Sequence, residues 1–300
     1  MGGEVLPAEV VFRPIVEGSV RAIELEAGGI DIAYALEPRD YLRLEDGSNP
    51  RVVVEAIETL STNYVGFNAA KAPYDDVRVR QAINHALDVG AIIDAIYEGL
   101  GNPANGPISP QVFGANLDLE GYDYDPERAR ALLAEAGYPN GFDTTIWTND
   151  NPLRIQIAEI AQAFLADVGV NVEIQVLEWG AYLDGTAAGN HDMFILGWVT
   201  VTADADYGLY ALFHSSQFGN AGNRTFWASD RLDELLDLGR SEADADTRME
   251  IYAEAQEIIA EQAPWIFLNV TLEMNGWRDN VDGFIAHPAG SHRLANVQKN

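Results

Sequence analysis

The stretch that organises this sequence is residues 192–207, which read DMFILGWVTVTADADY. Four apolar residues lead into Gly197 and Trp198, and small, hydroxylated and acidic residues follow. A continuous apolar run is typical of a strand that is buried on both faces of a sheet. An aromatic residue with polar neighbours is typical of the wall of a ligand pocket. The stretch therefore predicts a core strand that delivers five candidate ligand contacts: Trp198, Thr200, Thr202, Asp204 and Asp206.

Strands and helices alternate on both sides of this stretch, which predicts an α/β fold. Asp76 precedes a segment with apolar residues at helical spacing, and Asp125-Pro126 opens another helix as N-cap and first helical residue. Further helices are predicted at 17–27, 157–168, 229–238 with Gly239 as its stop, and 246–262. Strands are predicted at 10–12, 30–36, 52–67, 143–148, 170–177 and 265–268, with the first two and the intervening helix forming a parallel unit. Residues 101–124 read as a long loop.

Composition limits the possible functions. The chain has 300 residues, 47% of them hydrophobic, which is enough for one large domain or two. A formal net charge of −29 makes nucleic acid and anionic membranes poor partners. There is no cysteine, no apolar run of about 20 residues, and no signal-peptide pattern at Met1–Glu4. The chain reads as soluble, either cytoplasmic or as an exported protein whose signal segment is not present.

Catalytic and metal-binding patterns are weak. Asp204 and Asp206 are the natural carboxylate pair for glycoside hydrolysis, but two residues apart on an extended segment they point the same way. The five histidines lack the spacings of metal ligands, so neither a metal nor another cofactor is expected. An acidic glycoside hydrolase remains the enzymatic alternative.

Aromatic residues beside polar clusters provide further candidates for a small-molecule site. Trp147 and Asn149 lie in one such cluster, and Arg224, between an asparagine and a threonine, could hold a carboxylate with both ends of its guanidinium. Each has an alternative interpretation: Trp147 could fill the core, and Arg224 could form a surface salt bridge.

Several segments resemble the extracellular solute-binding proteins of ABC importers of the peptide and nickel type. The matching segments are Ala22–Ala33, Phe67-Asn68, Pro73–Ile83, Tyr124–Gly137, Leu212–Ser215, Asp233–Leu236 and Tyr252–Ile259. The resemblance implies a periplasmic-binding-protein-like clamshell of type II, with one lobe largely complete and the other partial. Residues 1–65 and 266–300 would belong to the first lobe and 66–265 to the second, with hinges near 64–68 and 263–267. Because family members are longer, the chain resembles their C-terminal half or more.

The resemblance also implies a function and a ligand class. A monomeric protein of this family, in the periplasm or outside the cell, would capture a short peptide and deliver it to membrane permease subunits. The Trp198 segment is most similar to the glutathione-binding branch. Dipeptide-binding members place an aspartate where Val201 stands and an arginine where Thr148 stands, so the resemblance favours glutathione or another modified peptide. Asn68 lies on the strand implied to cross between lobes, and oligosaccharides are the alternative ligands within the family.

Overall fold

The computed structural model describes residues 6–219 and 222–300. By their internal contacts these residues form two units, one ending at Thr59 and resuming at Thr271, the other spanning Leu60–Val270. Strands β2 (Val52–Phe67) and β7 (Trp265–Arg278) contribute residues to both units. The predicted boundaries at 65/66 and 265/266 fall inside the same two strands. The assignment of the units to the lobes of a binding protein stays a prediction.

The first unit contains short elements around parts of β2 and β7. Its elements are α1 (Gly18–Ala27), β1 (Ile32–Ala33), α2 (Pro38–Glu45), β8 (Val281–Asp282) and β9 (Gln298–Lys299). Helix α1 ends at Gly28, whose positive φ of 79° is the left-handed cap that glycine adopts without steric cost. This confirms the helix predicted at 17–27.

The predicted strand at 10–12 is wrong, and so is the parallel unit built on it. Val11 is 76% exposed and Phe12 63% exposed, and residues 10–12 pair with no strand. Strand β1 is shorter than predicted and pairs antiparallel with β7, with Ile32 opposite Trp277. An apolar run of three residues without a partner strand has no ladder to join, so its composition alone cannot make it a strand.

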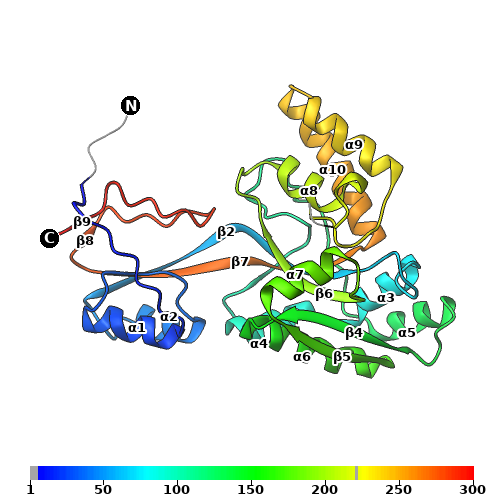
Figure 1. Ribbon diagram of the computed structural model, residues 1–300, viewed down its shortest axis with the longest axis horizontal. Coiled ribbons are helices and arrows are strands. Elements are labelled where there is room, and N and C mark those ends of the chain that lie inside the picture. The colour runs from blue at the N-terminus through cyan, green and yellow to red at the C-terminus, as the bar shows by residue number, and fades with distance from the viewer. Residues whose placement is uncertain (1–5, 220–221) are drawn as a thin grey trace. The chain divides into compact units, whose positions relative to one another are not determined.

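The second unit is built on a mixed sheet in the order β7-β2-β6-β4-β5 (Figure 1). Strands β4 (Phe142–Asn149), β5 (Val170–Leu177) and β6 (Met193–Val199) lie parallel, and β6 runs antiparallel to β2. The short β3 (Asn102–Pro103) pairs with β7. The parallel strands end together, so their carboxyl ends gather the residues that follow them at one edge.

The helices of this unit begin at local capping residues. The Asp76 side chain accepts a hydrogen bond from the Arg78 N–H, and Asp125 accepts one from the Arg128 N–H, which confirms both predicted helix starts. The predicted stop at Gly239 is wrong, because α9 continues to Ser241 and Gly239 packs against Tyr252. The helices are α3 (Val77–Ala86), α4 (Val89–Tyr97), α5 (Pro126–Glu135), α6 (Pro152–Asp167), α7 (Trp179–Ala187), α8 (Ala205–Phe213), a 3-10 turn (Ser215–Gln217), α9 (Asp230–Ser241) and α10 (Ala245–Gln262).

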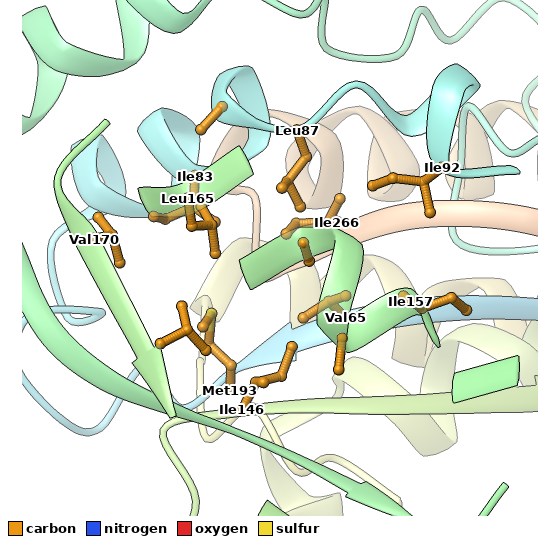
Figure 2. Close-up of a cluster of buried hydrophobic side chains, with 14 of the residues drawn as sticks. Val65, Ile83, Leu87, Ile92, Ile146, Ile157, Leu165, Val170, Met193 and Ile266 are labelled. Carbon is orange, nitrogen blue, oxygen red and sulfur yellow. The ribbon is translucent and has the colours of Figure 1, made fainter. Parts of the chain in front are cut away.

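The main hydrophobic core lies between one face of this sheet and helices α3 to α6. Figure 2 shows Val65, Ile146 and Met193 from three adjacent strands facing side chains of the helices, such as Ile157 and Leu165 of α6. The predicted stripe of apolar residues on α6 is therefore the surface that the helix buries. Burial of this cluster holds β4, β6 and α6 in a fixed arrangement.

The opposite face of the sheet carries aromatic residues. The Tyr64 and Trp265 rings stack with centroids 3.4 Å apart, and Phe194 meets Tyr64 edge-on. From α7, the Tyr182 hydroxyl donates to the Ile195 carbonyl over 2.6 Å. Both faces of β6 are thus covered along its apolar run, as the sequence predicts.

Candidate ligand-binding site

Trp198 lies near the carboxyl end of β6, where the buried run meets solvent. Its backbone pairs with Thr62 of β2, and its half-buried ring packs against Tyr207 with centroids 5.2 Å apart. Within the described part of the chain, the buried indole Nε1 has no hydrogen-bond acceptor. An indole N–H is nearly always paired when it is buried, so Trp198 Nε1 is an unsatisfied donor at this edge of the sheet.

The turn after Trp198 is held by backbone hydrogen bonds. The Thr200 N–H donates to the Leu60 carbonyl, and the Ala203 N–H donates to the Thr200 carbonyl, each over 2.8 Å. Thr200 is only 2% exposed, and its side chain lies against Gly208. Thr202, in contrast, is exposed. The turn therefore presents the Thr202 side chain to solvent and uses Thr200 for packing.

Asp204 links three elements. Its carboxylate accepts a hydrogen bond from the Asp206 N–H at the start of α8, and two from Arg248 of α10 over 2.9 and 3.0 Å. Burial opposes ionisation of this carboxyl, but the hydrogen bonds from Arg248 and Asp206 outweigh burial and lower its pKa. Asp204 thus carries a charge that Arg248 already neutralises.

Asp206 has a different environment. Its carboxylate lies 3.1 Å from the Nε of Arg240, while burial raises the pKa of its carboxyl, an effect that Arg240 partly offsets. Each carboxylate is paired with its own arginine, so the two aspartates do not flank a common space. The geometry gives no support to a hydrolytic pair.

Trp147 and Asn149 lie on β4, beside β6. Trp147 pairs with Phe194, four residues before Trp198, and its ring lies against Gly185 of α7 and His191. Asn149 lies at the carboxyl end of β4, where its Oδ1 accepts a hydrogen bond from Arg154. Of these two candidates, Asn149 shares the carboxyl-end edge of the sheet with Trp198.

Asn68 and Arg224 lie away from Trp198. Antiparallel pairing places Phe67 opposite Met193, so Asn68 follows at the amino end of β6, where its amide donates to the carbonyls of Gly189 and His191. Arg224 is 9% exposed and donates to Thr186 and to the Gly222 carbonyl. The interpretation of Arg224 as a surface salt bridge is therefore wrong. The ligand-contact roles of all nine candidate residues stay predictions.

The structure adds two residues that the sequence analysis missed. Arg154 of α6 and Asn63 of β2 lie near Asn149 and Gly197 at the carboxyl-end edge, with Trp179 of α7 beside Arg154. A Cβ on Gly197 would lie 2.6 Å from Asn63 Oδ1 and 3.5 Å from Arg154 Nη2, so the glycine makes room for both side chains. One signal was present in the sequence: an arginine, rather than an acidic residue, follows Asn151-Pro152 in the first turn of a helix.

Two further observations concern metal ions and membranes. Among residues 6–219 and 222–300, no group of three or more histidine, aspartate or glutamate side chains is placed to hold a metal ion. No helix in the same ranges is both long and apolar enough to cross a bilayer.

The second unit is thus a mixed α/β unit with a tryptophan and amide side chains at the carboxyl edge of its sheet. Residues 1–220 match the family described as bacterial extracellular solute-binding proteins, family 5, middle region. The chain belongs to this family, which confirms the resemblance in the sequence and places the chain among solute-binding proteins rather than enzymes.

Curated relatives differ in the ligands for which they are named. The chain is 32% identical to the dipeptide-binding protein of Escherichia coli K12 over 96% of its length, and 34% identical to heme-binding protein A of Haemophilus influenzae over 94%. It is 31% identical to the glutathione-binding protein of Pectobacterium atrosepticum over 93%. It covers 54%, 52% and 55% of these relatives, so the chain spans about half the length of the curated relatives it matches.

Solved structures confirm the predicted α/β fold. An ABC-transporter-associated periplasmic binding protein of Helicobacter pylori, in complex with the peptide STSA, superposes with a TM-score of 0.86 at 34% identity. The match covers 96% of this chain and 56% of that one. A dipeptide-binding protein of Pseudoalteromonas in complex with Met-Leu gives 0.84 at 29% identity, covering 95% and 57%. The chain therefore has the fold of part of a periplasmic binding protein.

Proposed function

We propose that this chain is part of the solute-binding component of an ABC importer, which captures a short peptide and passes it to permease subunits in the membrane. The observation that carries the proposal is Trp198: a half-buried ring with an unpartnered indole N–H at the carboxyl edge of the sheet, in a chain of a solute-binding family. Peptides offer carbonyl oxygens that an indole N–H can bind and side chains that pack on an aromatic ring.

Glutathione or another modified short peptide fits the site better than a plain dipeptide. Val201 offers no carboxylate for an α-amine, and Asp204 is already paired with Arg248. Thr148 is fully buried on β4. The relatives named for dipeptides, glutathione and heme are 31 to 34% identical to the chain, so identity does not rank their ligands. These three ligands differ in shape, but all carry free carboxylates.

Isothermal titration of the chain would test the proposal with glutathione, Met-Leu, the peptide Ser-Thr-Ser-Ala and heme in separate experiments. Saturable binding of at least one peptide supports the proposal, and tighter binding of glutathione than of Met-Leu supports the finer assignment. The absence of a binding signal with every peptide would overturn the peptide function. Binding of cello-oligosaccharides instead would favour the sugar-binding alternative of the same family.

A further inference from the structure

The carboxyl edge of the sheet carries a cation that no acidic side chain neutralises. Arg154 is half-buried in the first turn of α6, and its Nη1 donates to Asn149 Oδ1 over 3.0 Å. Among the described residues, its guanidinium makes no other hydrogen bond and lies within ion-pair distance of no carboxylate. This is unusual in a chain with 47 acidic and 18 basic residues.

Two other arginines of the same unit show the contrast. Arg80, which is 2% exposed, uses three guanidinium nitrogens on the carbonyls of Tyr74 and Gln262. Arg248 is held in a two-hydrogen-bond pair by Asp204. These two arginines have structural partners for most of their donors, whereas Arg154 keeps most of its donors available for another acceptor.

The surroundings of Arg154 favour an anion. Helix α6 has no acidic residue in its first turn, so the partial positive charge of its N-terminus adds to that of the guanidinium. The side chain of Glu178, which precedes Trp179, is used by the N–H groups of Gly180 and Ala181 at the start of α7. The Asp150 carboxylate accepts a hydrogen bond of 3.4 Å from the Asn149 amide. The Arg154 guanidinium carbon lies 6.0 Å from the centre of the Trp179 ring, which provides a flat apolar surface beside the cation.

Gly197 allows the Arg154 guanidinium to approach the strand. Gly197 has no side chain at the point where Asn63 and Arg154 approach β6, and the next residue along the strand is Trp198 with its unpartnered indole N–H. Arginine binds carboxylates through two parallel N–H groups, and such charge-assisted bonds are about twice as strong as neutral ones.

From this geometry we infer that Arg154 binds a carboxylate of the ligand, with Asn149 holding the guanidinium in place and Gly197 allowing it to lie beside β6. The inference rests on the proposed function and narrows it to carboxylate-bearing solutes. The family resemblance implies an arginine at position 148, where this chain has a threonine. Arg154 would supply a cation at the same edge of the sheet.

Titration with matched acid and amide ligands tests this assignment. The probes are Met-Leu and Met-Leu amide, which differ in the carboxylate, measured by calorimetry at pH 7 on the chain and four variants. The unmodified chain should bind the acid about tenfold or more tightly than the amide, because a charge-assisted pair is lost. Arg154→Ala should reduce this ratio to about one with little change in amide affinity, and Arg154→Lys should retain part of the preference.

Arg231→Ala is the matched control, because Arg231 is an exposed arginine that pairs with Glu234 and Glu254 on the outer helices. It makes the same change in net charge and should keep the full preference for the acid. Arg154→Gln retains a donor for Asn149, and its melting temperature distinguishes misfolding from loss of the cation. An unchanged preference for the acid in Arg154→Ala and Arg154→Gln would overturn the assignment of Arg154 but not the proposed peptide function. Failure of the unmodified chain to bind either probe, glutathione or Ser-Thr-Ser-Ala would instead refute the proposed peptide function, and this assignment with it.

Discussion

At the scale of single residues, partial burial distinguishes a ligand contact from a core side chain. Trp198 is half-buried, whereas Trp265 is 2% exposed and stacked on Tyr64. The indole N–H of each is unpartnered among the described residues, so exposure is what separates them. We expect Trp198→Ala to weaken peptide binding by more than about 1 kcal/mol with a small change in melting temperature. Trp265→Ala should instead cost about 3 to 5 kcal/mol of stability. Calorimetry and thermal unfolding measure both, and a large fall in melting temperature with unchanged affinity in Trp198→Ala would show that Trp198 is core.

His191 predicts a pH dependence of stability. Burial lowers the pKa of its imidazole from 6.5 to about 4, which outweighs the hydrogen bond with the Arg224 carbonyl. The unfolded chain therefore binds a proton between pH 6.5 and 4 that the folded chain excludes. Stability should fall as the pH drops through this window, by up to about 3 kcal/mol, and this contribution should level off below about pH 4.

Denaturant unfolding at several pH values measures this slope. His191→Gln keeps a donor for the Arg224 carbonyl but does not titrate, so its slope between pH 6.5 and 4 should be smaller than that of the unmodified chain. His85→Gln, at a histidine on the more exposed α3 surface, is the control. Equal slopes for His191→Gln and the unmodified chain would contradict the prediction.

At the scale of elements, two glycines after α5 differ in the space available for a side chain. Gly137 and Gly141 both have positive φ, 95° and 73°, but a Cβ on Gly141 would lie 1.8 Å from the Gly169 carbonyl oxygen, while one on Gly137 meets nothing within 4 Å. Gly137→Ala should cost about 1 kcal/mol through backbone strain. Gly141→Ala should cost at least about 3 kcal/mol, because the turn before β4 must move away from the turn before β5. Equal losses in chemical denaturation would contradict this difference.

Helix starts and strands with a strong local pattern, such as 170–177, were predictable from the sequence, whereas the pairing of distant segments was not. Asp76 and Asp125 mark helix starts because capping involves only neighbouring residues. The strand at 10–12 failed because strand formation depends on a partner that composition does not reveal. Trp198 could be singled out from its own segment. Arg154 and Asn63 could not be, because only the pairing of β2 with β6 and the packing of α6 bring them to Gly197.

At the scale of the whole molecule, net charge controls stability. With a formal net charge of −29, like charges repel one another in the compact state, and added salt screens this repulsion. We expect the melting temperature at pH 7 to rise by several degrees between about 0.01 and 0.5 M sodium chloride, since the Debye length falls from about 30 Å to a few ångströms. An equal osmolality of sucrose controls for solvent effects. A melting temperature that falls with salt would show that attractive ion pairs dominate.

Strands β2 and β7 contain the two points at which the chain passes between the units. The polypeptide leaves the first unit after Thr59 and re-enters it at Thr271, and the Thr59 hydroxyl donates to the Thr271 carbonyl over 3.0 Å. Residues 60–270 are therefore an insertion whose two ends lie on neighbouring strands. Two in-frame crossovers, one in each of these adjacent strands, would exchange the whole second unit between related genes.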